Sequence, residues 1–373
     1  MIKNKKINIL IPMAGEGSRF KIKGFDRPKP LIKINETCLI EKAVSTLGID
    51  GNYIFITRRY KDPNHNIELN KVLKKIAPGC KILEINHTTE GATATCLIAK
   101  ELINNDEPLI ITNCDQSLDW EANKFLSNIE NSSIDGCVVT YDSNNPKNSF
   151  IKLNKEGNVE KLAEKEAISN LALIGLHYWK YGKDFVYSAE TMIQQNQKSK
   201  SEYYIAPTYN ILISEGKKIT NYHIDKNQYT SLGSPEDVTI YIGQQNEYNP
   251  KKLKTIFCDI DGTLLKHGHK FSKVSSEEPE LLPGVREKFD AWDSLNYRII
   301  LMTGRKESAR ELTESHLRKV GLCWDLLIMN AGNGPRVLIN DKLHTNSPDR
   351  AISVNVEVDK GFDSIEDWGK IGL

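Results

Sequence analysis

The sequence has almost no net charge, no paired-cysteine motif and no long apolar run. Its 50 Lys and Arg residues are balanced by 49 Asp and Glu residues, which leaves a formal charge of +1. The long-range field that attracts nucleic acid or an anionic membrane is therefore missing, and we expect neither as a partner. The apolar run at residues 7–14 is too short for a signal peptide or a membrane span, which favours a cytoplasmic location.

The cysteines form no recognisable pattern. The seven cysteines are scattered and include no CxxC pair: Cys38, Cys80, Cys96, Cys114, Cys137, Cys258 and Cys323. We expect reduced packing residues rather than a disulfide frame or a zinc site. Hydrophobic residues make up 39% of the chain and charged residues 27%, as in folded proteins. At 373 residues the chain exceeds what one hydrophobic core usually serves, so two domains are expected.

Short apolar runs alternate with helical periodicity from the start, which predicts an α/β fold with a helix-covered parallel sheet. The strands are expected at 7–11, 53–56, 81–85 and 109–111, and the helices at 41–47, 68–76, 93–102 and 122–129. From Gly136 strand-like segments follow one another closely, at 137–141, 150–153, 159–163 and 171–178. They predict a second, partly antiparallel sheet or an insertion.

A polar stretch at 243–254 interrupts the pattern and predicts a linker. A new alternation follows, with strands expected at 255–259, 298–302, 326–329 and 337–339 and helices at 284–296 and 307–320. The sequence therefore predicts two α/β domains, 1–245 and 246–373, of which the second is smaller.

A glycine-rich turn follows the first expected strand, at Ala14-Gly15-Glu16-Gly17-Ser18-Arg19. Its small residues let backbone N–H groups approach phosphates, and Arg19 adds a cation. It is not a P-loop, because no GK[ST] follows, and Phe20 stands where a dinucleotide fingerprint has its third glycine.

Two further residues strengthen this reading of the turn. Pro28 and Pro30 restrict the backbone on both sides of Lys29, so its ammonium is presented with a reduced loss of entropy. Asp115 follows the fourth expected strand, and in a parallel sheet the ends of the strands meet at one edge.

The GxGxR loop followed by Pro28-Lys29-Pro30-Leu31 resembles the nucleotidyltransferase family that makes activated sugars and alcohols from a nucleoside triphosphate and a phosphomonoester. The resemblance covers residues 7–237 and implies a Rossmann-like domain with a mixed, mainly parallel sheet. It implies that Arg19 neutralises the triphosphate, that Lys29 grips the α-phosphate and that Asp115 binds Mg²⁺. The loop residues expected around the nucleotide are Ala14, Gly15, Gly17 and Ser18.

Two more segments fit the family. Glu90, Gly91 and Ala92 correspond to the small-residue segment that packs against the base. Glu164 and Lys165 correspond to the Glu-Lys pair that faces the phosphate of the acceptor.

One position departs from the family. Ser231 stands where a second metal-binding Asp is usual, and a neutral hydroxyl is a poor Mg²⁺ ligand. Either water and phosphate complete the metal shell, or another acid such as Asp225 reaches in.

A second motif, TIFCDIDGTLL, occupies residues 255–265. Alternate residues of a strand share a face, so Asp259 and Asp261 lie on the same side. This suits a nucleophile, Asp259, followed by a general acid and base, Asp261. The motif resembles the haloacid dehalogenase superfamily of phosphatases, and the resemblance covers residues 254–356.

The later motifs of that superfamily follow in order. The resemblance implies that Thr303 binds the phosphoryl group and that Asp341 holds Mg²⁺ together with Asp259. Arg336 is preferred over Lys306 as the accompanying cation. The gaps between these motifs leave no room for a large cap, so a Rossmannoid domain with an open site is expected.

These expectations describe a bifunctional enzyme with Mg²⁺ as cofactor, a nucleotidyltransferase fused to a phosphatase, in the supply of precursors for a surface or capsular polysaccharide. The partners are a nucleoside triphosphate and a phosphorylated sugar or polyol. The Gly-Ser-Arg-Phe form of the loop favours CTP. Two alternatives stay open: a guanylyl- or uridylyltransferase acting on a sugar 1-phosphate, and a nucleotide-binding regulatory module beside an active phosphatase. Whether the chain forms a homo-oligomer also stays open.

Overall fold

The computed structural model describes residues 7–247, 254–267, 278–295, 297–332, 334–341, 350–365, 368–369 and 373. The chain divides into two compact units, unit 1 (Met1–Tyr248) and unit 2 (Asn249–Leu373). Residues 248–253 of the expected linker lie outside the described residues. The linker prediction was wrong at its start, because helix α9 (Pro235–Glu247) continues past Gly243. Gln, Asn and Glu extend an existing helix at little cost, so polarity alone does not end it.

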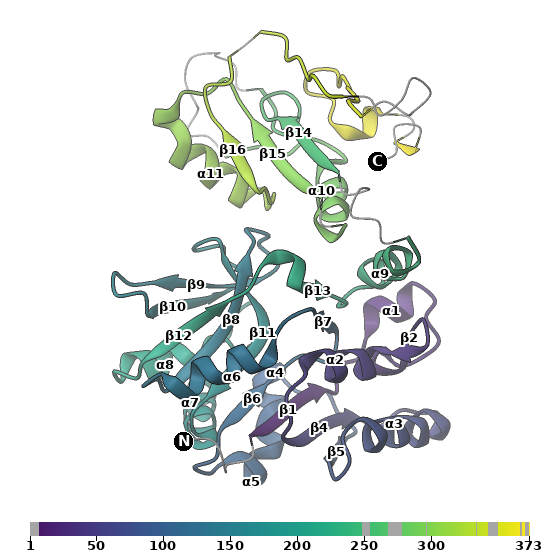
Figure 1. Ribbon diagram of the computed structural model, residues 1–373, viewed down its shortest axis with the longest axis vertical. Helices are drawn as coiled ribbons and strands as arrows, with labels where there is room; N and C mark the ends of the chain where they lie inside the picture. Colours follow the sequence, from purple (N-terminus) through teal and green to yellow (C-terminus); the bar gives the residue numbers. More distant parts are fainter. Residues whose placement is uncertain are drawn as a thin grey trace. The chain divides into compact units, whose positions relative to one another are not determined.

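Unit 1 is built on one mixed, nine-stranded sheet (Figure 1). The order along its main path is β10-β9-β11-β6-β1-β4-β5, while β8 pairs with β11 and β12 pairs with β8. Strand β1 is parallel to β4 and β6, whereas β11 is antiparallel to β6, β8 and β9. The antiparallel segments therefore extend the first sheet and form no second one.

The expected strands of unit 1 are confirmed, with shifts at their ends. The sheet contains β1 (Asn8–Met13), β4 (Asn52–Arg58), β5 (Lys81–Ile85), β6 (Leu109–Ile111), β8 (Gly136–Asp142), β9 (Ser149–Leu153), β10 (Val159–Glu164), β11 (Leu171–Trp179) and β12 (Ile219–His223). Two short pairs accompany it, β2 (Lys33–Ile34) with β3 (Thr37–Cys38), and β7 (Gln116–Leu118) with β13 (Tyr229–Ser231).

Helices cover both faces of this sheet. Besides α9, the described helices of unit 1 are α1 (Ser18–Ile22), η1 (Lys29–Leu31), α2 (Leu39–Leu47), α3 (Pro63–Ile76), α4 (Ala92–Cys96), η2 (Leu97–Ala99), α5 (Lys100–Ile103), α6 (Ala122–Asn131), α7 (Gly182–Gln194), α8 (Thr208–Ser214) and η3 (Lys226–Gln228). The single helix expected at 93–102 is thus broken by a 3₁₀ turn, since α4, η2 and α5 divide it.

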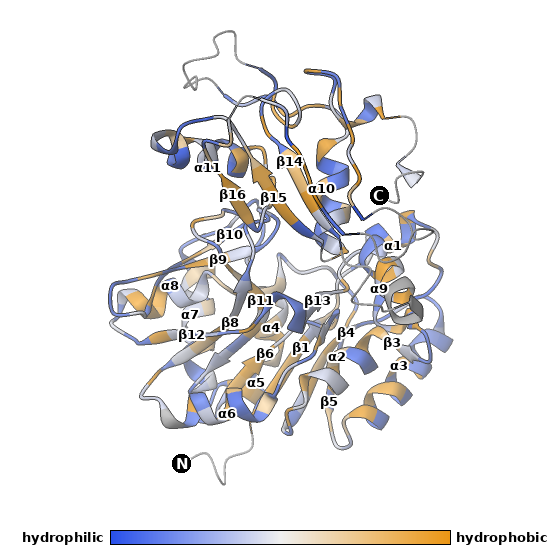
Figure 2. Cartoon of the chain, turned by 45° about the horizontal axis from the view of Figure 1, so that its top comes forward, coloured by the Kyte–Doolittle hydropathy of each residue, from blue (hydrophilic) through white to orange (hydrophobic). Residues whose placement is uncertain are grey.

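Strand β1 shows how the core is divided. Ile9 and Ile11 belong to the buried cluster that includes residues of α2, α3 and α6, whereas Leu10 belongs to the cluster with residues of α4, α5, α7 and α8. A strand that is covered by helices on both faces needs apolar side chains on both faces. This explains why residues 7–11 form an almost continuous apolar run that predicts a strand. Figure 2 shows the apolar strands of unit 1 as an orange layer.

Unit 2 contains a parallel sheet of β14 (Thr255–Asp259), β15 (Arg298–Met302) and β16 (Leu326–Ile328). Among its described residues the helices are α10 (Val285–Ser294), η5 (Glu307–Ala309), α11 (Arg310–Lys319) and η6 (Phe362–Ser364). The strand expected at 337–339 is not formed. Val337 is 81% and Ile339 is 90% exposed, and no strand pairs with them within the described residues. An apolar run becomes a strand only where a neighbouring strand satisfies its backbone.

Two expectations about the chain as a whole can be compared with the structure. All seven cysteines are unbonded and most are buried, as expected of packing residues. None of the described helices has the length and apolarity that a bilayer crossing requires.

Candidate functional site

A pocket of about 300 Å³ lies in unit 1 at the carboxyl edge of the sheet. Because β1 and β6 are parallel neighbours, the segments that follow them lie together at this edge. The pocket is lined by Pro12, Met13, Gly15, Gly17, Ser18, Arg19, Phe20, Lys29, Pro30, Asn113, Cys114, Asp115 and Gly233. The structure therefore brings together the glycine-rich loop, the Lys between two prolines and the Asp after β6.

Lys29 is the most tightly held cation of this pocket. Its Nζ lies 2.5 Å from Asp115 Oδ2 and donates to the carbonyl of Gly233 at 3.1 Å, and it lies 5.2 Å from the ring centre of Phe20. Burial works against its charge, but Asp115 outweighs burial and the pKa of Lys29 is raised. The side chain is therefore a protonated cation that is already positioned inside the pocket.

Arg19 is placed differently. Its side chain is exposed at the pocket, and among the described residues no hydrogen bond or ion pair engages this side chain. Gly17 lets the loop pass close to Lys29: its φ is 63°, and an added Cβ would lie 3.3 Å from the Cβ of Lys29. The loop thus supplies one cation that no neighbour engages, beside a second cation that is already paired.

Asn113 was not singled out in the sequence, yet it lines the pocket. Its Nδ2 lies 3.5 Å from the carbonyl of Ile174. At Gly175, where φ is 78°, an added Cβ would lie only 2.0 Å from that Nδ2. The register of β11 against β8 shifts between Leu173 and His177, so Gly175 sits at an irregularity of the strand that makes room for Asn113.

The base segment, which we define as residues 90–92, does not line the pocket. Glu90 pairs with Lys198 at 2.9 Å, and Ala92 begins α4. A Cβ at Gly91 would lie 2.6 Å from the backbone of Tyr203, so glycine is needed for this close approach. Ala14 is buried just before the pocket loop.

Glu164 and Lys165 also lie outside the pocket lining. Glu164 accepts a hydrogen bond from Ser149, and Lys165 donates to the hydroxyl of Tyr204, whose ring centre lies 4.6 Å from the ammonium. Burial raises the pKa of Glu164, although Ser149 and Lys165 act against it. Lys165 directly follows β10 and has a φ of 54°, in the left-handed region that non-glycine residues rarely adopt.

The surroundings of Ser231 decide how a Mg²⁺ ion fits unit 1. Asp225 caps η3 at the far end of β13 from Ser231, so it does not replace the missing acid. Asp237 lies 3.5 Å from Ser231 Oγ and accepts from the backbone of Ser234 at the start of α9. No group of three potential metal ligands occurs in the described part of the chain. One carboxylate, Asp115, fits an ion whose other ligands are phosphates and water, but not a preformed metal site.

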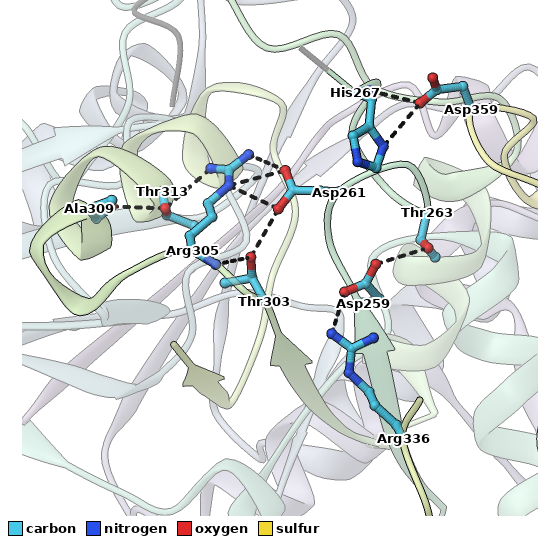
Figure 3. A network of polar contacts seen from close by, with 10 residues as sticks. All are labelled: Asp259, Asp261, Thr263, His267, Thr303, Arg305, Ala309, Thr313, Arg336 and Asp359. Carbon is cyan, nitrogen blue, oxygen red and sulfur yellow. Dashed lines mark hydrogen bonds and ion pairs between the residues drawn. The ribbon is translucent and has the colours of Figure 1, made fainter. Parts of the chain in front are cut away.

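In unit 2 the carboxylates of Asp259 and Asp261 are held by different arginines (Figure 3). Asp259, at the end of β14, pairs with Arg336 at 2.8 Å and lies 3.4 Å from the hydroxyl of Thr263. Burial raises the pKa of Asp259, although Arg336 counteracts it. The nucleophile candidate and the cation candidate are therefore in contact.

Asp261 is clamped by residues that follow β15. Arg305 Nη2 donates to Asp261 Oδ1 at 2.6 Å and its Nε lies 3.1 Å from both carboxylate oxygens. Thr303 is fully buried and donates to Asp261 Oδ2 at 2.9 Å (Figure 3). The hydroxyl of Thr303, which was expected to bind a phosphoryl group, thus donates its hydrogen bond to Asp261. Arg305 was missed as a functional residue, because its partner lies 44 residues earlier in the sequence.

Asp341 is not where the Mg²⁺ expectation requires it. It pairs with Arg350 at 2.6 Å, and among the described residues no contact joins it to Asp259. The reason is the missing strand: residues 337–339 do not extend the sheet, so they do not carry Asp341 to the end of β14. As placed, Asp259, Asp261 and Asp341 are each paired with an arginine, and they do not fit a Mg²⁺ site.

Comparisons with known proteins concern unit 1. Residues 9–241 match a family described as nucleotidyl transferase. A nucleoside-diphosphate-sugar pyrophosphorylase from Vibrio cholerae RC9 is similar in structure, with a TM-score of 0.55, 23% identity and coverage of 63% of this chain and 100% of that chain. A UDP-glucose pyrophosphorylase complexed with UDP-glucose is also similar, with a TM-score of 0.52 and 20% identity. The match covers 65% of this chain and 100% of that chain. At these identities the likeness shows a shared fold. Among curated proteins none matches the sequence.

Proposed function

Because the chain belongs to the nucleotidyl transferase family, we propose that unit 1 transfers a nucleotidyl group from a nucleoside triphosphate to a phosphorylated sugar or polyol, with release of pyrophosphate. The observation that carries this proposal is the pocket at the edge of β1 and β6, where Arg19, Lys29 and Asp115 meet. Its two cations and its glycine-rich loop suit a ligand with several adjacent phosphates.

In the proposed reaction an oxygen of the acceptor's phosphate forms a bond to the α-phosphorus. The bond from that phosphorus to the bridging oxygen breaks, and pyrophosphate leaves. Arg19 would neutralise the leaving pyrophosphate, and Lys29 would hold the α-phosphate. Lys29 is already fixed by Asp115 and the carbonyl of Gly233, so it needs little reorganisation to do so. A Mg²⁺ ion beside Asp115 would supply further charge neutralisation on the phosphates.

The Gly-Ser-Arg-Phe form of the loop supports CTP as the donor, and Glu164 with Lys165 would receive the acceptor. A pyrophosphate-release assay tests this, with CTP, UTP, GTP and dTTP against a panel of phosphorylated sugars and polyols. Release with CTP alone is the expected result. Release only with GTP or UTP and a sugar 1-phosphate would replace the cytidylyl assignment. Nucleotide binding without any release would favour the regulatory module, which the neutral Ser231 supports.

For unit 2 we propose phosphomonoester hydrolysis through an aspartyl-phosphate. A carboxylate oxygen of Asp259 would bond to phosphorus while the bond from phosphorus to the ester oxygen breaks, and the carboxyl of Asp261 would give its proton to that leaving oxygen. Water would then attack the phosphorus, the bond from phosphorus to Asp259 would break to release phosphate, and the carboxylate of Asp261 would accept the proton of the water. Arg336, 2.8 Å from Asp259, lies where it can contact the transferring phosphoryl group. Together the two units would supply precursors for a surface polysaccharide.

Reciprocal variants test the second proposal. Asp259→Asn is expected to abolish hydrolysis of p-nitrophenyl phosphate and to leave pyrophosphate release unchanged. Asp115→Asn is the matched control, because it replaces an Asp by Asn in the other unit and is expected to do the reverse. Retained phosphatase activity in folded Asp259→Asn would contradict the assignment of the nucleophile.

A further inference from the structure

An acidic residue, Glu16, stands in the middle of the loop that would hold the triphosphate. On its own it would repel the phosphates, since two negative charges a few ångströms apart disfavour binding. The structure shows what holds Glu16. Arg58, the last residue of β4, places Nη2 3.2 Å from Glu16 Oε1 and Nη1 3.4 Å from the carbonyl of Ala14. One guanidinium thus contacts two points of the loop.

The same guanidinium also contacts the loop that follows β5. Arg58 Nη1 donates to the hydroxyl of Thr88 at 3.2 Å, and that hydroxyl donates to Glu16 at 3.1 Å. The next residue, Thr89, donates to the carbonyl of Gly91 at 3.2 Å, within the base segment. Arg58, Glu16 and Thr88 therefore form a closed triangle of contacts between the phosphate loop and the chain that enters the base segment.

This triangle differs from an ordinary surface ion pair. The side chain of Arg58 is only 20% exposed, although that of Glu16 is 54% exposed, so solvent screens this pair from one side only. Its contacts reach two separate loops, and the planar fork of the guanidinium holds its donors in a fixed geometry toward both. The neighbouring residue, Arg59, is the ordinary case: it is 69% exposed and pairs with Glu84 of the adjacent strand β5.

We propose that Arg58 is a positioning residue, which ties the phosphate loop to the base segment and sets their spacing before a nucleotide arrives. The proposal rests on the proposed nucleotidyl transfer. Arg58 neutralises Glu16, so the loop can carry an acid without repelling the triphosphate. A loop that is already ordered loses less conformational entropy on binding, so the benefit is expected in nucleotide affinity.

The first experiment needs no nucleotide. Backbone order parameters of residues 14–17 and 87–89 are measured by nitrogen relaxation in the wild type, Arg58→Ala and Arg59→Ala. We expect values near ~0.85 in the wild type and Arg59→Ala, and below ~0.6 in both loops of Arg58→Ala. Arg59→Ala is the matched control, because it removes the same charge from the next position of the chain. Unchanged order in Arg58→Ala would overturn the proposal.

The second experiment separates positioning from a general structural role. In Arg58→Ala the KM for the triphosphate is expected to rise about 10-fold or more, with kcat within about twofold of wild type, because the lost contacts serve ground state and transition state alike. Glu16→Gln removes the charge of the pair but keeps hydrogen-bonding atoms at this point, so its KM is expected to lie between those of the wild type and Arg58→Ala. Arg58→Lys cannot make the fork and is expected to lie between.

The outcomes distinguish the two proposals. An unchanged KM in Arg58→Ala, or an equal rise in Arg59→Ala, would refute the positioning role. If wild-type protein releases no pyrophosphate with any triphosphate, the proposed function fails, and the relaxation measurement still decides whether Arg58 orders the two loops. A thermal unfolding midpoint for each variant excludes loss of the folded state as the cause.

Discussion

Gly175→Ala is expected to destabilise unit 1 and to disturb the nucleotide pocket. Any residue with a Cβ pays about 1–2 kcal/mol for the left-handed backbone at this position, where φ is 78°. The new Cβ would in addition lie 2.0 Å from Asn113 Nδ2, and overpacking of this kind costs about 1–3 kcal/mol. The free energy of unfolding should therefore fall by about 2–5 kcal/mol.

Gly157→Ala is the matched control, because its φ is also 78° but no atom lies within 4 Å of the added Cβ. Its free energy of unfolding should fall only by the cost of the left-handed backbone, about 1–2 kcal/mol. Denaturant unfolding of both variants measures the difference, and titration with nucleotide measures whether the pocket changed. Nucleotide affinity should fall in Gly175→Ala alone, because Asn113 lines the pocket. Equal destabilisation of the two variants would refute the steric argument.

Three further outcomes are expected. Burial lowers the pKa of His177 from 6.5 to about 3, so between about pH 6 and 4 only the unfolded chain takes up this proton. Over that range the free energy of unfolding of the wild type should fall by about 1.4 kcal/mol per pH unit relative to that of His177→Phe, as measured by acid unfolding curves. Parallel curves for the two proteins would contradict this. Lys29→Met should reduce pyrophosphate release by about 100-fold or more while unit 2 keeps its phosphatase activity, and loss of both would show that the units are not independent. Arg305→Lys should lower the phosphatase kcat by about 100-fold with little change in KM, because Asp261 loses the two contacts that Arg305 makes with it. An unchanged kcat would show that Arg305 does not position Asp261 for the reaction.

The pocket residues that sequence reasoning found are those whose signal is local. Lys29 is flanked by prolines, and Arg19 and Asp115 each lie in a segment that follows an apolar strand. Parallel strands bring such segments to one edge, so no knowledge of distant contacts was required. The α/β order of both units followed from the same local alternation.

The contacts that sequence reasoning missed join residues far apart in the chain. Arg58 and Glu16 are 42 residues apart, and nothing in either local pattern marks the partner. The space for Asn113 depends on an irregularity in a strand about sixty residues later, and the shift of register is a property of pairing. Asp341 was misplaced for a related reason: its apolar run resembles a strand, but whether a strand forms depends on a neighbour that the run does not specify.

Charge balance inside the pocket limits how strongly it attracts an anion from a distance. Of the charged residues that line it, Lys29 and Asp115 cancel, which leaves the single charge of Arg19. Salt screens such a charge over about 8 Å at physiological ionic strength. The rate at which a nucleotide encounters the pocket should therefore vary little with salt, and choice among nucleotides would occur after contact, through short-range hydrogen bonds.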